Sequence, residues 1–184
     1  MRIIAGTARG TRLRAPKGWD TRPTADRVKE SLFDILGARV QNACVLDLFA
    51  GTGALALEAL SRGAESAVLI DRATYATLAE NARRTKLEAR AEIRRGDVYG
   101  QVAALTRDGR TFNLIFADPP YACGDNVRVL AAVDAGALLA AGGLFVLEQG
   151  ADEPLITHSG RLSLMRERCY GAARICFYTQ EVQK

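Results

Sequence analysis

Apolar residues recur at two different spacings along this chain, and the alternation between the spacings is its clearest feature. From residue 43 onward, apolar runs of strand length alternate with segments whose apolar residues recur every three or four positions. The runs predict strands at residues 43–48, 66–71, 91–95, 112–117 and 144–149. The intervening segments predict helices at residues 54–62, 73–84, 99–106 and 127–139. Strands separated by helices of this length indicate βαβ units around a parallel sheet.

The C-terminal part has a different pattern. Extended segments at residues 161–168 and 172–179 are separated only by residues 169–171. Adjacent strands with so short a connection form an antiparallel hairpin, here added to the edge of a parallel sheet. The predicted fold class is therefore α/β, with a Rossmann-like, mostly parallel seven-stranded sheet and a C-terminal antiparallel hairpin.

Before residue 38 the pattern predicts a small N-terminal extension. Residues 2–4 and 11–14 are extended segments around a turn-rich stretch, which predicts a β-hairpin. Apolar residues at helical spacing then begin after Thr24, a good N-cap, and end at Gly37, where a helix would stop. We divide the chain into this hairpin and helix, residues 1–37, and one larger domain, residues 38–184, because 184 residues suffice for one main core.

Positive charge is concentrated in that extension. The whole chain has a formal net charge of +4, but residues 1–30 contain eight Lys or Arg and three Asp or Glu. The rest of the chain is therefore slightly acidic. Such asymmetry predicts a polyanionic partner that binds the N-terminal part, the alternative being a solvated basic arm without a partner.

Cysteine and histidine usage argues against a zinc site. The chain has one histidine and no Cys-x-x-Cys pair, so free thiols in a reducing compartment are expected. No apolar run approaches the length of a transmembrane helix, and the first residues lack the layout of a signal peptide. We expect a cytoplasmic protein that uses no metal and no membrane. Its four cysteines are Cys44, Cys123, Cys169 and Cys176.

The sequence Asp-Pro-Pro-Tyr at residues 118–121 directly follows the apolar run at residues 112–117. In open α/β sheets, ligands bind beyond the carboxyl ends of the strands. Two prolines stiffen the loop and remove two N–H donors, which leaves its carbonyls as acceptors. Asp118 and Tyr121 would then offer an acceptor and a stacking ring to a flat base with an exocyclic amine. Considered alone, the motif is also compatible with an ordinary turn.

A glycine turn follows the first strand of the larger domain. Gly51 and Gly53 would let the backbone approach a ligand closely, and Ala56 occupies the third position of a dinucleotide fingerprint. Asp47, however, precedes the turn. Its carboxylate would repel a pyrophosphate and attract a cationic cofactor, so NAD is the less favoured alternative.

Two more acids follow the next two predicted strands. Asp71 is placed to accept hydrogen bonds from ribose hydroxyls, and Asp97 from an adenine amine. Each acid alone could instead be a helix N-cap. Together with Asp47, and without a basic residue in the glycine turn, they predict a pocket for an adenosyl group that carries a sulfonium.

These motifs resemble those of class I S-adenosylmethionine-dependent methyltransferases that act on exocyclic amines. The Arg-Pro-Thr segment at residues 22–33, combined with the glycine turn and helix at residues 47–63, resembles the bacterial RsmD family more specifically. The resemblance extends over residues 2–178. Enzymes of this family methylate the N2 amine of one guanine in 16S ribosomal RNA.

The resemblance implies S-adenosyl-L-methionine as cofactor. It also implies 16S rRNA as partner, either as free RNA or within the small ribosomal subunit or its assembly intermediate. We expect the protein to be a monomer. The implied cofactor-binding residues are Asp47, Phe49, Ala50, Gly51, Gly53, Asp71, Asp97, Val98 and Asp118. The implied catalytic residues are Asp118, Pro119, Pro120 and Tyr121. The candidate RNA-binding residues are Arg9, Arg12, Arg14, Arg22, Thr24 and Arg27.

Other functions remain open at this point. The Asp-Pro-Pro-Tyr motif also suits adenine-N6 or cytosine-N4 methylation, although 184 residues leave no room for a separate DNA-reading domain. A non-catalytic RNA-binding assembly factor could use the same scaffold, but the intact Asp118 and glycine turn argue against it. A dehydrogenase is disfavoured by Asp47.

Overall fold

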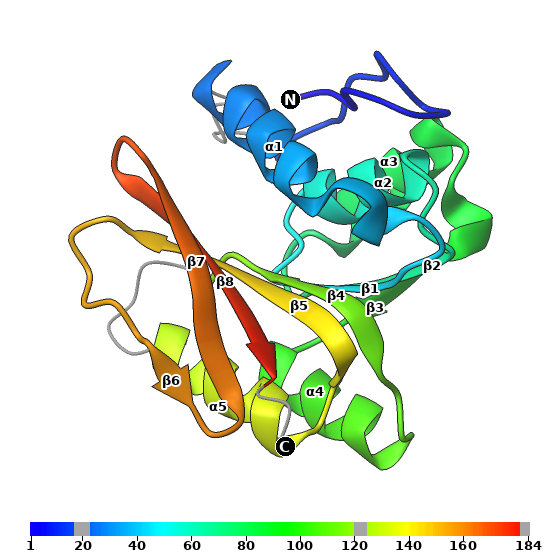
Figure 1. The fold of residues 1–184 in the computed structure, drawn as a ribbon. Helices are drawn as coiled ribbons and strands as arrows, with labels where there is room; N and C mark the ends of the chain where they lie inside the picture. The colour runs from blue at the N-terminus through cyan, green and yellow to red at the C-terminus, as the bar shows by residue number, and fades with distance from the viewer. Residues whose placement is uncertain (17–22, 120–124, 181–184) are drawn as a thin grey trace.

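A computed structural model describes residues 1–16, 23–119 and 125–180, without the side chains of residues 23–25 (Figure 1). Its helical segments are α1 (Pro23–Leu36), η1 (Gly37–Val40), α2 (Ala54–Ser61), α3 (Tyr75–Thr85), η2 (Glu88–Arg90), α4 (Val98–Arg107) and α5 (Asp125–Ala135). Its strands are β1 (Cys44–Leu48), β2 (Ser66–Asp71), β3 (Ala91–Arg95), β4 (Phe112–Ala117), β5 (Leu139–Gly150), β6 (His158–Ser159), β7 (Leu162–Tyr170) and β8 (Ala173–Gln180). The described strands form one sheet in the order β3-β2-β1-β4-β5-β8-β7-β6.

The sheet has the predicted mixture of strand directions. Strands β1 to β5 pair in parallel with their neighbours, whereas β8 is antiparallel to β5 and β7 is antiparallel to β8. This confirms the α/β fold with an antiparallel C-terminal hairpin. The described residues contain eight strands instead of seven, because the two-residue strand β6 adds to the edge of β7.

Strand β5 and helix α5 also differ from their predicted bounds. Helix α5 ends at Ala135 instead of residue 139, and Ala137 has a positive φ of 48° that a helix cannot continue through. Leu139 instead pairs with Phe112 of β4, so β5 begins five residues earlier than predicted. Local apolar spacing favoured helix in this segment, and pairing with β4 overrides it.

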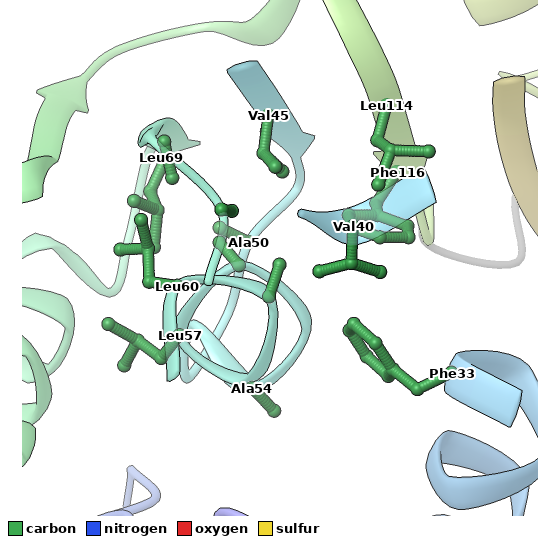
Figure 2. Close-up of a cluster of buried hydrophobic side chains, with 14 of the residues drawn as sticks. Phe33, Val40, Val45, Ala50, Ala54, Leu57, Leu60, Leu69, Leu114 and Phe116 are labelled. Atoms are coloured by element: carbon green, nitrogen blue, oxygen red, sulfur yellow. The ribbon is translucent and has the colours of Figure 1, made fainter. Parts of the chain in front are cut away.

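Helices cover both faces of the sheet (Figure 1). Side chains that alternate along the strands belong to two separate buried clusters, one beneath α1, α2 and α3 and the other against α4 and α5. Figure 2 shows the first cluster, in which Phe33, Leu57 and Leu60 from the helices point toward strand residues such as Leu69 and Phe116. We call the side beneath α1, α2 and α3 the α1–α3 face.

The N-terminal segment packs onto this layer. Across the predicted hairpin, the Ile3 N–H donates to the Thr11 carbonyl at 2.9 Å and the Gly10 N–H donates to the Ile3 carbonyl at 2.8 Å, although the described hairpin contains a single ladder bridge between Arg2 and Arg12. Ile3 is completely buried and belongs to the same cluster as α2. The turn docks on the end of α2, where the backbone N–H of Ala8 donates to Ser61 Oγ at 2.9 Å.

A buried carboxylate joins the N-terminal segment to both helices. Glu58 of α2 is completely buried and accepts hydrogen bonds from the backbone N–H groups of Ile4 at 2.8 Å and Ala5 at 3.0 Å. Its oxygens also lie 3.2 Å from Lys29 Nζ of α1 and 2.8 Å from Arg62 Nε. Burial lowers the pKa of Lys29, and the nearby Glu58 opposes that shift. Because a buried charge needs such partners, Glu58 holds the three segments together.

Candidate active site

Acidic side chains from adjacent strands meet at the carboxyl edge of the sheet. Asp47 of β1 pairs with Leu69 of β2 and with Phe116 of β4. Asp71 and Asp118 therefore lie two residues further along the neighbouring strands. Since side chains alternate along a strand, all three carboxyls are on the α1–α3 face. Both Asp71 and Asp118 contribute to the electrostatic environment of Asp47, which agrees with this convergence.

The turn between β1 and α2 is built from residues with left-handed backbone conformations. Phe49, Gly51 and Gly53 have φ values of 64°, 56° and 77°. A Cβ atom on Gly53 would lie 3.0–3.2 Å from three leucine side chains, so a larger residue would disturb the packing as well as the backbone. The N–H of Ala50 donates to the Ile70 carbonyl at 3.0 Å and ties the turn to β2. The turn is thus a fixed backbone cradle at the sheet edge.

Asp47 lies beneath this cradle. It is 3% exposed, and its Oδ2 accepts a hydrogen bond from the Ala56 N–H at 3.1 Å. Burial raises the pKa of Asp47 to about 7, the Ala56 hydrogen bond opposes this shift, and Asp118 and Asp71 add to it. A cation bound near Asp47 would favour its charged form.

Asp71 connects the cradle to the start of α3. Its Oδ2 accepts from the Gly51 N–H at 3.0 Å, and its Oδ1 accepts from the N–H groups of Ala73 and Thr74 at 2.8 Å each. A carboxylate has about four acceptor sites, so three are used and one remains on Oδ2. That site suits one ribose hydroxyl.

Asp97 caps the next helix. Its Oδ2 accepts from the Gly100 N–H at 3.0 Å, as the N-cap alternative predicts, and Val98 behind it is buried. Within the part of the chain that the structure describes, the other carboxylate oxygen accepts no hydrogen bond. The Gly96 N–H donates to the Asp71 carbonyl at 3.3 Å, which keeps Asp97 beside the cradle. Asp97 can therefore cap α4 and still accept from an amine.

Aromatic contacts hold the cradle to the helices on the opposite face. Phe49 packs edge-on against Tyr99 at a ring-centroid distance of 6.4 Å. The Tyr99 hydroxyl donates to Asp125 at 3.3 Å, and the Arg128 guanidinium lies 3.6 Å from the Tyr99 ring centre. Sequence reasoning missed Tyr99 and Arg128, because nothing in a single sequence indicates that α4 and α5 contact this turn.

Asp118 stands at the end of β4, with its residue exposed and the following Pro119 buried. Desolvation by the surrounding protein raises the pKa of Asp118. Glu148 occupies the corresponding position on β5, since Ala117 pairs with Leu147. Desolvation and the charge of Asp118 raise the pKa of Glu148 in turn. Sequence reasoning missed Glu148, although it ends an apolar run as Asp47 and Asp71 do.

Several predicted site residues lie outside the described part of the chain. Pro120, Tyr121 and Arg22 are among them, and of Thr24 only the backbone in α1 is described. The proposed roles of these residues stay predictions.

The remaining candidate RNA-binding arginines differ in their surroundings. Arg9, Arg12, Arg14 and Arg27 are all exposed, but Arg14 is ion-paired, because its Nε lies 2.9 Å from Glu80 Oε1 of α3. Asn81 bridges the Arg14 backbone and the Thr52 carbonyl, with hydrogen bonds of 2.8 Å and 2.9 Å, so Arg14 lies near the glycine turn.

Arg9 lies at the other end of this N-terminal segment. It belongs to the turn that docks on Ser61, at the far end of α2. Because α2 has eight residues, the two ends of the segment are separated by about 12 Å along the helix. The candidate RNA-binding arginines are therefore spread from the carboxyl ends of the parallel strands, where the glycine turn lies, toward the amino ends of these strands.

The described residues fit an adenosyl cofactor. Gly51 and Gly53 present backbone without side chains at the cradle, Asp71 and Asp97 each keep acceptor capacity, and Asp47 favours positive charge. Among these residues, no group of three or more His, Cys, Asp or Glu is arranged to hold a metal ion. None of the described helices is both long and apolar enough to span a membrane.

Comparisons with known proteins agree with this geometry. The family model described as conserved hypothetical protein 95 matches residues 1–179. Ribosomal RNA small subunit methyltransferase D of Escherichia coli K12 is 36% identical over 185 residues, which cover 100% of this chain and 91% of the relative. The solved structure of yhhF from Escherichia coli is 36% identical, with a TM-score of 0.87 and coverage of 100% of this chain and 99% of that one.

A more distant structure shares the fold alone. SMU.776, solved in complex with SAH, is 17% identical with a TM-score of 0.69, and the match covers 86% of this chain and 50% of that one. The family match spans nearly the whole chain and includes every motif on which the resemblance depends. The chain therefore belongs to the conserved hypothetical protein 95 family, which is the RsmD family indicated by its sequence.

Proposed function

We propose that this chain transfers a methyl group from S-adenosyl-L-methionine to the exocyclic N2 amine of a guanine in 16S rRNA. Its family and the name of its Escherichia coli relative support an rRNA methyltransferase of the small subunit. The cradle and the acids around it support the cofactor. The observation that carries the proposal is Asp118, which extends from the edge of the sheet beside that cradle.

When bound, the cofactor supplies an electrophilic methyl group. The protein must therefore position an amine that is a poor nucleophile, because its lone pair is delocalised into the base. Asp118 and the Pro119 carbonyl accept hydrogen bonds from the amine and direct its lone pair toward the methyl group. Correct orientation of this kind can lower a barrier by ~7–11 kcal/mol.

Asp118 has a second role as the reaction proceeds. The nitrogen becomes positively charged as the nitrogen–carbon bond forms and the carbon–sulfur bond breaks. The Asp118 carboxylate stabilises that charge and then accepts the proton that the nitrogen loses. Its raised pKa makes it a better proton acceptor than an ordinary carboxylate. Tyr121 is proposed to stack on the base, with a stabilisation of ~1–3 kcal/mol.

The N-terminal hairpin and helix, residues 1–37, are proposed to bind the RNA. Exposed arginines on this extension supply positive charge for the phosphate backbone. The base must be unpaired or flipped out, since its amine is unreachable within a helix. The proposal describes a monomer acting in the cytoplasm on small-subunit RNA or on an assembly intermediate.

Product identification tests the proposed function. The protein is incubated with labelled S-adenosylmethionine and, separately, with 16S rRNA, small-subunit particles or DNA, and the labelled nucleoside is identified by mass spectrometry. The expected product is N2-methylguanosine from RNA or particles. Labelled N6-methyladenosine or N4-methylcytosine would show that the methylated base is adenine or cytosine instead of guanine. RNA binding without any labelled product would indicate an assembly factor.

A further inference from the structure

Glu148 has no role in the family resemblance, yet it stands beside Asp118. Ala117 of β4 pairs with Leu147 of β5, so residues 118 and 148 are at the same level on adjacent parallel strands. Neighbouring strands are about 4.8 Å apart. Phe116 and Val146 both belong to the cluster of the α1–α3 face, and two residues further along, the side chains of Asp118 and Glu148 project to that face as well.

The Glu148 carboxylate is not neutralised by its surroundings. Within the described residues it has neither a hydrogen-bond donor nor a basic partner. On its other side, Glu148 pairs with Ile175 of β8, a buried apolar residue that has no side-chain donor. The Tyr170 hydroxyl of β7 forms its hydrogen bond with Ser31 Oγ, at 2.6 Å. Two adjacent carboxylates repel each other, and a ligand that provides N–H groups to both would relieve that repulsion. The raised pKa of both groups agrees with this proximity.

The bases differ in what lies next to their amine. In guanine, the N2 amine is adjacent to the N1–H group, so the Watson–Crick edge presents neighbouring donors. In adenine and cytosine, the ring nitrogen at the corresponding place is an unprotonated acceptor. A second carboxylate beside the group that binds the amine therefore suits guanine and opposes the other two bases.

We propose that Glu148 is a specificity-determining residue that accepts the N1–H of the target guanine, while Asp118 accepts an N–H of its N2 amine. The inference rests on the proposed function and adds the selection of the base to it. A site built to accept a hydrogen bond rejects an analogue that cannot donate one, because the acceptor in the site is then left unpaired.

The test changes the hydrogen-bonding character of both partners. The methylated guanine is first located in small-subunit RNA, and a ligated RNA is then made with guanine or 2-aminopurine at that position. 2-Aminopurine keeps the amine but has an unprotonated N1. Glu148→Gln supplies an amide N–H that can donate to this nitrogen. We expect this variant to methylate guanine at least tenfold more slowly and to raise the 2-aminopurine-to-guanine rate ratio at least tenfold.

Binding provides a readout that does not depend on turnover. The fluorescence of 2-aminopurine changes when the base exchanges its stack in the RNA for the surroundings of the site, so titration with protein follows entry into the site. Glu148→Gln should bind the 2-aminopurine RNA at least threefold more tightly than the wild type does. The control is Asp108→Asn, at an exposed position after α4 on the other face of the sheet, which should leave rates and binding unchanged.

The outcomes separate this inference from the proposed function. If the wild type forms no N2-methylguanosine, the proposed function fails. If it forms that product but the 2-aminopurine-to-guanine ratio is the same in wild type and Glu148→Gln, the role of Glu148 alone is overturned. If thermal unfolding shows that Glu148→Gln folds poorly, Glu148→Asp is used instead. This variant retains the acceptor and must keep the wild-type preference for guanine. Loss of that preference would also overturn the role of Glu148.

Discussion

Asp47 is a carboxyl group that the fold favours in its protonated form. Because burial raises its pKa from an ordinary value near 4 to about 7, the folded protein binds this proton more tightly than the unfolded chain does. The contribution of Asp47 to stability is therefore fully present at low pH and is lost as pH rises from about 4 to about 7. A bound sulfonium offsets that loss by stabilising the charged form.

The titration of Asp47 predicts a pH-dependent preference between cofactor and product. S-adenosylmethionine carries a sulfonium charge that S-adenosylhomocysteine lacks, whereas both carry the same amino acid group. As Asp47 ionises, affinity for the former should increase relative to the latter by roughly threefold or more between pH 6 and pH 8. Calorimetric titration of both ligands measures this ratio. The ratio should depend less on pH in Asp47→Asn than in the wild type, because Asp118 and Glu148 still ionise there. An equal pH dependence in the wild type and in Asp47→Asn would contradict the assignment to Asp47.

Asp118 is predicted to act on turnover more than on binding. Asp118→Asn keeps the size of the side chain but removes the charge that stabilises the developing ammonium. Single-turnover methylation should slow at least tenfold, while affinity for S-adenosylhomocysteine changes less than twofold. Asp108→Asn, at an exposed position after α4, is the matched control. A wild-type methylation rate in Asp118→Asn would exclude Asp118 from catalysis.

Residues at strand ends were predictable to different degrees. Asp47, Asp71 and Asp118 could be chosen from the sequence because each follows an apolar run and precedes a turn. Glu148 also ends an apolar run, but its relation to Asp118 depends on the register between β4 and β5, which apolar spacing does not determine.

At the scale of elements, the N-terminal hairpin depends on one close contact. Gly6 and Gly10 both have positive φ values, but a Cβ on Gly6 would meet the Ser61 carbonyl oxygen at 1.8 Å, whereas a Cβ on Gly10 meets nothing within 4 Å. Gly6→Ala should therefore detach the hairpin from α2, while Gly10→Ala adds only backbone strain of about 1 kcal/mol.

Hydrogen exchange of the Ile3 and Gly10 amides measures this difference. Their protection should fall at least tenfold further in Gly6→Ala than in Gly10→Ala, with the sheet amides protected in both. Equal protection of the two variants would show that the contact with Ser61 does not hold the hairpin.

The elements of the larger domain were predictable because their apolar periodicity agrees with their place in the sheet. Strands β2, β3 and β4 have the predicted bounds. The exceptions depend on pairing between distant segments. Leu139 belongs to β5 because β4 supplies a partner, and the two-residue strand β6 exists only beside β7. Such short or edge segments carry too little periodicity to be recognised alone.

At the scale of the molecule, the basic extension is the proposed RNA contact. Arg9 and Arg12 are exposed and have no ion pair within the described residues. If each contacts one phosphate, the double variant Arg9→Ala/Arg12→Ala should reduce the slope of log affinity against log salt by about 1.4–1.8. Titration of 16S rRNA at several salt concentrations measures the slope.

A control with the same change in charge is available on the other side of the sheet. Arg94 and Arg110 each pair with Glu92, at 2.6 Å and 3.4 Å, beside the edge strand β3. Arg94→Ala/Arg110→Ala should leave the slope close to the wild-type value. Equal slopes for the two double variants would mean that net charge, and not the N-terminal extension, governs RNA binding.

The central claim is that the acceptor at the end of β4 faces the reacting end of a cofactor held by the turn after β1. A crystal structure of the protein with S-adenosylhomocysteine tests it most directly. We predict that the ligand contacts the Gly51–Gly53 cradle, with its ribose at Asp71, its adenine at Asp97 and its sulfur directed toward Asp118. A ligand bound elsewhere, with its sulfur remote from Asp118, would contradict the account.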